Sequence, residues 1–185
     1  TAWSPIEVEG ITERELGHQF EWAWLLYRYG HTFERSRATK LADRIYAYGK
    51  AAMQTAIGGS VGPLPNRIDL AGRPRDIARP LWPLTELLRA ACLAEISGHG
   101  AGNAEIAAEA LRVLFAQYMD LESGLWINAL DPNVPSSERV VPSRLLYHIV
   151  PPLITYARER EAAFDISNPI LDRYVNHAQS ANASD

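Results

Sequence analysis

Apolar residues recur along most of this chain at spacings of three and four positions, which is the period of an α-helix. One clear run passes from Leu41 through Ile45 and Tyr48 to Ala52. Glycine and proline residues interrupt the pattern and divide it into segments. We therefore predict an all-α chain whose helices cover about 17–29, 36–57, 83–97, 103–118 and 143–160.

The connections between these helices alternate in length, and the long ones, 58–78 and 119–142, are candidates for function. Such alternation is typical of stacked helical hairpins with a site built at one end. We expect 67–73 to form a short hairpin or a structured loop. The arginines of this region fit either a phosphate or acidic-sugar site or solvated loop charges; they are Arg67, Arg73, Arg75 and Arg79.

Individual glycine and proline residues indicate where the elements end. Residues 1–16 are expected to form an extended lead-in. Gly30 and Gly58 are expected to end the first two helices. Pro151 and Pro152 are expected to kink the last helix or to move its start to near Pro152.

Composition narrows the class of protein. The 185 residues suit one domain, and their formal charge of -4 with both signs interspersed argues against nucleic-acid binding. The single cysteine, Cys92, cannot form an internal disulfide, which favours a reducing, cytoplasmic setting. No apolar run reaches the ~20 residues that span a membrane. Neither the His and Cys spacings nor the glycines of 58–62 fit a metal or phosphate-loop template, so no metal and no cofactor are expected.

The first predicted helix carries the chain's first candidate for chemistry. His18 and Glu21 lie one turn apart on one face, because positions i and i+3 are neighbours on a helix. Apolar residues surround them on almost every side, so we expect the pair to be buried. Two interpretations remain open: a core histidine held by its glutamate, or a general base oriented by a carboxylate.

Three other stretches add aromatic and ionisable residues. Trp82 and Glu86 stand four apart at a helix start, which fits either core packing or an aromatic platform and carboxylate that face a polyol. Trp126, in Gly124-Leu125-Trp126, is interpreted as a packing anchor. His148 lies in an apolar helix start and fits a core histidine or a site residue. The other histidines, His31, His99 and His177, are interpreted as surface residues.

These four stretches, in their order and spacing, resemble the C-terminal half of the N-acylglucosamine 2-epimerase superfamily, over about 3–158. The family has an (α/α)6 barrel fold with a sugar site at one mouth. The resemblance implies half of such a barrel over 1–160 and a C-terminal extension, in part disordered, over 161–185. Family members are about twice as long. This chain has Leu84 where the family usually has glutamine and Leu16 where it usually has proline.

The resemblance also assigns roles to residues. His18 and His148 would be the two acid/base catalysts, and Glu21 would hold His18 and polarise a sugar hydroxyl. Trp82 and Glu86 would line the sugar pocket. The substrate-binding set is completed by Trp22, which follows Glu21 directly.

The implied activity is that of a sugar 2-epimerase or aldose–ketose isomerase, acting through an enediolate on a monosaccharide such as mannose or an N-acylhexosamine. The expected partners are the small-molecule sugar and either further copies of the chain or a missing N-terminal half. Two alternatives are an inactive fragment and a non-catalytic helical module that binds carbohydrate or another protein. A third, a glycosidase, would need Glu21 and Glu86 as its acid pair.

Overall fold

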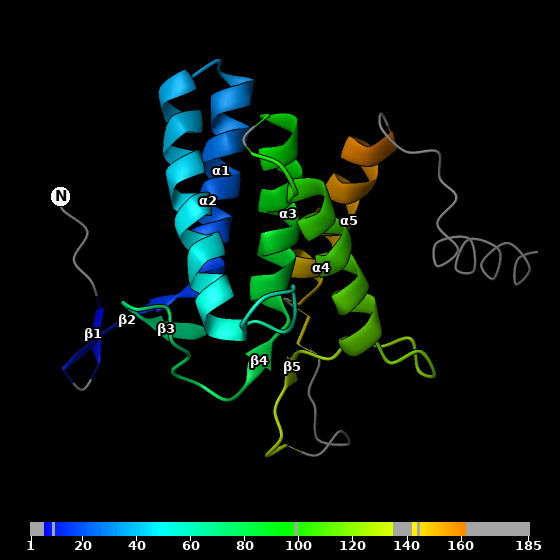
Figure 1. Cartoon of the computed structure of the whole chain (residues 1–185). Coiled ribbons are helices and arrows are strands. Elements are labelled where there is room, and N and C mark those ends of the chain that lie inside the picture. Colours follow the sequence, from blue (N-terminus) through cyan, green and yellow to red (C-terminus); the bar gives the residue numbers. More distant parts are fainter. Residues whose placement is uncertain (1–5, 9, 99, 135–141, 144, 162–185) are drawn as a thin grey trace, which may run out of the picture.

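The computed structural model describes residues 6–8, 10–98, 100–134, 142–143 and 145–161. Five helices make up most of this part of the chain, and Figure 1 shows them packed side by side: α1 (Leu16–Thr32), α2 (Ser36–Ile57), α3 (Trp82–Ile96), α4 (Asn103–Gln117) and α5 (Leu145–Glu161). The helix α3 is central, because it contacts α1, α4 and α5, while α2 packs on α1. The all-α prediction is confirmed.

The end of α1 corrects one prediction. α2 ends where expected, with Gly58 in the left-handed region at φ 73° and its N–H donating to the Gln54 carbonyl. The helix α1, in contrast, continues through Gly30 to Thr32. A Cβ on Gly30 would collide with the Thr39 side chain of α2. Gly30 therefore permits close packing of two helices and is not a stop signal.

The two prolines of α5 also behave differently from one expectation. The helix begins at Leu145 and runs through Pro151 and Pro152, so a start near Pro152 is wrong. Proline has no N–H, so the carbonyl groups four residues earlier, on Tyr147 and His148, receive no helical hydrogen bond from these positions. The first turn of α5 consequently has looser backbone bonding than a helix interior.

Short strands connect the helix starts to the long loops. The strands β1 (Ile6–Val8), β2 (Ile11–Glu15) and β3 (Arg67–Asp69) form an antiparallel sheet in that order. A second pair joins β4 (Arg79–Pro80) to β5 (Ala129–Leu130). The expected extended lead-in and structured loop therefore pair with each other.

Two tyrosines join the helices to their neighbours. Tyr118, just after α4, donates its O–H to the Arg79 carbonyl of β4 at 3.0 Å. Tyr27 of α1 donates to Asp43 Oδ1 of α2 at 2.7 Å. Burial raises the pKa of both hydroxyls, so they remain protonated donors at neutral pH.

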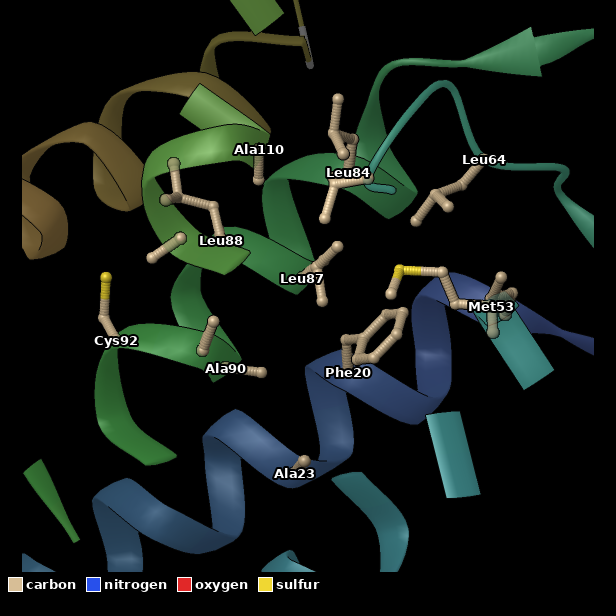
Figure 2. Close-up of a cluster of buried hydrophobic side chains, with 14 of the residues drawn as sticks. Phe20, Ala23, Met53, Leu64, Leu84, Leu87, Leu88, Ala90, Cys92 and Ala110 are labelled. Atoms are coloured by element: carbon tan, nitrogen blue, oxygen red, sulfur yellow. The ribbon is translucent and has the colours of Figure 1, made fainter. Parts of the chain in front are cut away.

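The hydrophobic core lies between α3 and its neighbours α1, α4 and α5, and continues between α1 and α2. Figure 2 shows Leu84, Leu87 and Leu88 of α3 close to Phe20 of α1, with Met53 of α2 nearby. Every residue from Pro83 to Ala94 is buried, as expected for a helix surrounded by its neighbours. The single cysteine, Cys92, is part of this core.

Some predictions fall on residues outside this description. The predicted extension over 161–185 lies there apart from Glu161, and so do His99 and His177. Among the described helices, none is long and apolar enough to cross a lipid bilayer.

Candidate active site

Three helix starts meet at one end of the molecule. His18 lies in the first turn of α1, Trp82 begins α3, and His148 lies in the first turn of α5. Figure 1 shows that α1 and α3 begin at the end that carries the strands. These three side chains line one hollow of about 650 Å³, a volume within the usual range of small-molecule sites.

The hollow is lined mainly by polar groups. Its walls come from the starts of α1, α3 and α5, from the loop 66–80 and from the stretch before β5. The lining residues are Glu15, His18, Glu21, Asn66, Arg67, Asp76, Ala78, Pro80, Trp82, Asn128, Leu145 and His148. Carboxylates, amides and imidazoles beside one large indole suit a ligand that has many hydroxyl groups and a small apolar face.

His18 is more exposed than its sequence context predicts. Its side chain is 50% exposed and that of Glu21 is 26% exposed, so the prediction of a buried pair is wrong. The reason is that α2 and α3 cover only two sides of α1. The side that carries Trp22 and Leu25 remains open, and these residues are 47% and 41% exposed.

Glu15, a residue that sequence reasoning missed, is the nearer partner of His18. Its Oε2 lies 2.7 Å from His18 Nδ1, whereas Glu21 Oε2 lies 3.8 Å from Nε2, beyond hydrogen-bond distance. Both glutamates are three positions from His18, and spacing alone cannot choose between them. The last residue of β2 is Glu15, so pairing between β2 and β3 fixes its position.

Asn66 connects this pair to the indole. Its amide nitrogen donates to Glu15 Oε1 at 3.3 Å, and its amide oxygen accepts from Trp82 Nε1 at 3.0 Å. The Asn66 carbonyl also accepts the Leu16 N–H at 3.0 Å. Nothing in the sequence pattern marks Asn66, because its role depends on a loop that returns to the start of α1.

Trp82 lies against both histidines. Its ring centroid is 5.0 Å from that of His18 and 5.9 Å from that of His148, so the imidazoles are separated by no more than the sum of these distances. Gly17 is buried beneath the indole, and a Cβ there would overlap the Trp82 ring carbons. The two histidines, 130 positions apart in the chain, therefore share one aromatic neighbour.

His148 is held by a buried carboxylate. Its Nδ1 lies 3.2 Å from Glu86 Oε1, and its side chain is 24% exposed where that of Glu86 is wholly buried. Neither Glu86 nor Trp22 is one of the described residues that line the hollow. The structure places Glu86 in the core behind His148 and not at the wall of the hollow, and its role in sugar binding stays a prediction. Trp22 lies on the open side of α1 and is 47% exposed.

The two histidines are thus held in the same way. In each, Nδ1 faces a carboxylate oxygen, and a neutral imidazole in that contact carries its proton on Nδ1. The other ring nitrogen, Nε2, is then a proton acceptor. Two imidazoles of this kind beside one hollow are able to remove and return protons on a bound molecule.

The arginines of the loop are already engaged by carboxylates. Arg67 Nη1 donates to Glu13 Oε2 at 3.1 Å, and Arg73 Nε donates to Asp69 Oδ2 at 2.7 Å. The two others have similar contacts: Arg75 with Glu13, and Arg79 with Asp76 and with nearby carbonyls. These arginines therefore hold the loop together instead of forming an open anion site.

The other sequence predictions can be placed as well. Trp126 packs edge-on against Phe115 with ring centroids 5.4 Å apart, in keeping with its interpretation as a packing anchor. His31 is exposed, as expected. Within the described part of the chain, no group of three or more His, Cys, Asp or Glu side chains is placed to hold a metal ion.

Comparison with known proteins now adds to this geometry. The model of the N-acylglucosamine 2-epimerase (GlcNAc 2-epimerase) family matches residues 3–151. The chain belongs to this family. A mannose-6-phosphate isomerase of Rhizobium meliloti (strain 1021) is 31% identical to this chain over 157 residues. That match covers 80% of this chain and 38% of that protein.

Solved structures show the same fold. A cellobiose 2-epimerase from Bacillus thermoamylovorans B4167 matches with a TM-score of 0.70 and 12% identity, over 84% of this chain and 42% of that one. A D-mannose isomerase matches with a TM-score of 0.68 and 18% identity, over 83% and 39%. The prediction that the chain forms part of an (α/α)6 barrel is confirmed. This family member spans about two fifths of the length of these relatives.

Proposed function

We propose that the protein containing this chain is a sugar 2-epimerase or aldose–ketose isomerase in which His18 and His148 transfer protons. Membership of the family supports sugar epimerase or isomerase activity. One observation carries the assignment of residues: two imidazoles, each with Nδ1 on a glutamate, lie beside the same indole in one hollow.

The proposed reaction begins with the open-chain sugar. One imidazole Nε2 takes the proton from C2, and the C2–H electron pair forms a C1–C2 double bond as the carbonyl oxygen becomes an enediolate oxygen. A second imidazole that enters the step protonated on Nε2 gives that proton to the opposite face of C2 and yields the epimer, whereas return from the first imidazole to the same face gives back the substrate. Protonation at C1, together with transfer of the C2 hydroxyl proton to the C1 oxygen, turns the C2–O bond into a carbonyl and gives the ketose. Positioned acid–base groups of this kind contribute about 10²–10⁴-fold each.

Helix N-termini beside the hollow offset part of the negative charge of the enediolate. The starts of α1, α3 and α5 surround the hollow, and each helix N-terminus has a partial positive charge from its backbone dipoles. Backbone dipoles that are fixed before the reaction stabilise developing charge without reorganisation. In this proposal the Trp82 indole packs on the apolar face of the sugar, and Glu21 accepts a sugar hydroxyl.

The charges of the hollow favour an uncharged monosaccharide, such as mannose or an N-acylhexosamine. The described walls contribute the carboxylates of Glu15, Glu21 and Asp76 and one arginine, Arg67, which is already bonded to Glu13. A sugar phosphate would meet more negative than positive charge there. The related isomerase of Rhizobium meliloti carries a phosphorylated sugar in its name, so both forms belong in the test.

The experiment is hydrogen exchange in D2O, followed by NMR. The protein is incubated with mannose, glucose, fructose, N-acetylglucosamine and mannose 6-phosphate, and deuterium at C2 and product sugars are measured. We expect His18→Ala and His148→Ala each to lower exchange by about 10²–10⁴-fold. The matched control is His31→Ala, an exposed histidine bonded to Ser97. Exchange retained in both site variants would remove them from the mechanism.

A second candidate is a module that binds sugar without reaction, for which the polar lining of the hollow and the Trp82 indole would suffice. It predicts sugar binding by calorimetry that depends on Trp82 but no exchange at C2. The glycosidase alternative loses its acid pair, because Glu86 is buried outside the hollow. The cytoplasmic location remains a prediction from cysteine usage.

A further inference from the structure

A buried ion pair lies beneath the hollow, one layer behind His148. The side chain of Glu86 is wholly buried and that of Arg89 is 3% exposed, and neither residue lines the hollow. Burial of two opposite charges costs desolvation free energy, and apolar residues of similar size often serve stability as well or better. Stability is therefore a weak reason for this pair, and its contact with His148 suggests another.

The hydrogen bonds of Arg89 converge on one carboxylate. Its Nη1 lies 3.2 Å from Glu86 Oε1 and 3.0 Å from Oε2. Its guanidinium carbon lies 3.5 Å from the centre of the Trp24 ring, a cation–π contact that fixes the plane of the group. Among the described residues, Arg89 Nε and Trp24 Nε1 have no hydrogen-bond partner. Packing on the Trp24 indole therefore holds the Arg89 guanidinium, and the hydrogen bonds of this guanidinium within the described chain go to Glu86.

The contact continues to the proposed base. Glu86 Oε1, one of the two oxygens held by Arg89, is also the oxygen that faces His148 Nδ1 at 3.2 Å. A carboxylate that keeps its negative charge can only accept a hydrogen bond, so the Nδ1 proton must come from the imidazole. A carboxyl group that took up a proton would be able to donate to Nδ1 and place the imidazole proton on Nε2.

We propose that Arg89 is a positioning residue that keeps Glu86 an acceptor and thereby fixes the tautomer of neutral His148, with Nδ1 protonated and Nε2 free to take a proton. The role of that free nitrogen in sugar chemistry rests on the proposed function. The tautomer itself is a property of the folded chain. His18 differs, because its Glu15 is 39% exposed and is held by the neutral amide of Asn66.

The test reads the tautomer directly. Ring nitrogen shifts of ¹⁵N-histidine-labelled protein distinguish Nδ1–H from Nε2–H, and the His148 signals are assigned with His148→Ala. We expect the Nδ1–H form in the unmodified chain and in Arg89→Lys, which keeps the cation. In Arg89→Met we expect that signature to be lost and exchange at sugar C2 to fall by roughly 10- to 100-fold. The Nε2–H form in the unmodified chain, or the Nδ1–H form kept in Arg89→Met, would overturn the proposal.

A second variant covers the case in which Arg89→Met does not fold, since it leaves a buried carboxylate unpaired. The double variant Glu86→Leu with Arg89→Met replaces both charges by apolar side chains. We expect it to fold, with the His148 proton moved to Nε2 and the His18 signals unchanged. Retention of the Nδ1–H form in this variant would contradict the proposal.

The two proposals fail separately. If His148→Ala leaves sugar exchange intact while the tautomer responds to Arg89 as expected, the proposed function is wrong and the role of Arg89 stands. If His148→Ala abolishes exchange but the His148 tautomer is the same in Arg89→Met as in the unmodified chain, the positioning role of Arg89 is wrong and the proposed function stands.

Discussion

At the scale of residues, Glu15 and Glu21 differ in their contact with His18. Glu15 Oε2 lies 2.7 Å from His18 Nδ1. Glu21 Oε2 lies 3.8 Å from His18 Nε2, so Glu21 faces the same hollow but has no hydrogen bond to His18. We predict that Glu15→Ala lowers C2 exchange by roughly 10- to 100-fold, because a mispositioned base loses reactive geometry. The same variant should release His18 from its Nδ1–H form in ¹⁵N spectra. Glu109→Gln, in the exposed ion pair with Arg112, is the control.

The companion variant Glu21→Ala decides between the two assignments. It should weaken sugar binding while it leaves the His18 spectrum as it was. If Glu21→Ala instead changes the His18 tautomer and Glu15→Ala does not, then Glu21 holds His18, as the sequence alone predicted.

Gly17 supports a separate prediction at the same scale. A side chain there would collide with the Trp82 ring, which is the shared neighbour of both histidines. We expect Gly17→Ala to displace the indole, to cost about 1–3 kcal/mol of unfolding free energy and to reduce the Trp82 fluorescence response to sugar. The control is Gly62→Ala, where a Cβ would meet nothing within 4 Å. An unchanged response in Gly17→Ala would show that the indole position is not critical.

Residues show where sequence reasoning reaches its limit. His18, Trp82 and His148 were identified from motifs whose order in the chain resembles a family, and the structure brings all three to one hollow. Glu86 was assigned to the pocket because four positions on a helix place it near Trp82. Spacing does not say how deep a residue lies, and α3 is buried on nearly all sides.

At the scale of elements, the turn after β3 depends on one carboxylate. Asp69 accepts the backbone N–H groups of Ala71 and Arg73 and the Arg73 guanidinium. The Arg73 backbone hydrogen bond is the main cause that lowers the pKa of Asp69, followed by the Arg73 and Ala71 contacts that act against its desolvation. This turn orders β3, which pairs with β2 and so with Glu15.

The sign of the pH effect follows from that lowered pKa. The folded state prefers ionised Asp69, so its contribution to stability is present above the unfolded pKa of about 3.9 and is lost as pH falls through the lower folded pKa. We predict that the urea midpoint falls as pH drops from about 5 toward 2, and that it falls less in Asp69→Asn. Glu122→Gln, an exposed carboxylate on another loop, is the control. Identical slopes in all three proteins would contradict this role for Asp69.

Helices and strands differ in how far the sequence determines them. The helix α2 was predicted with its observed bounds because its apolar period and its terminal glycine are local signals. The strands are two to five residues long, and apart from the local pairing of β1 with β2 they depend on partners far along the chain, as in the pairing of Glu15 with Arg67. Their pattern contains too few alternations to predict them. Asn66 and Glu15 were missed for the same reason.

At the scale of the whole molecule, the array α1–α3–α5 has two apolar edges. On α1 and its C-cap the exposed residues Leu25, Tyr29 and Phe33 recur four positions apart, and on α5 Leu146, Val150 and Ile154 do the same. Each set therefore forms a row along one side of its helix. Both helices contact α3 and lie on either side of it, so the two rows belong to the outer helices of this array (Figure 1).

Exposed apolar rows of this size mark interaction surfaces. The relatives with the same fold are longer, since this chain spans 42% of the cellobiose 2-epimerase and 39% of the D-mannose isomerase. In an (α/α)6 barrel each inner helix has inner neighbours on both sides, whereas here α1 and α5 each pack extensively on α3 but not on each other. We therefore predict that these rows are covered by further helices, from a second copy of the chain or from additional barrel helices.

The prediction is tested by the mass of the isolated chain as a function of concentration, measured by light scattering, and by the binding of a hydrophobic dye. We expect self-association that weakens at least tenfold in Leu25→Ser with Ile154→Ser, because each buried aliphatic side chain contributes about 1.5–3 kcal/mol. Leu121→Ser, a single residue on a loop that is 72% exposed, is the matched control. A chain that stays monomeric and binds no dye would show that the rows tolerate water. The hollow would then have to function with α1 and α5 as open walls, so C2 exchange by that monomer would make covering helices unnecessary for the chemistry.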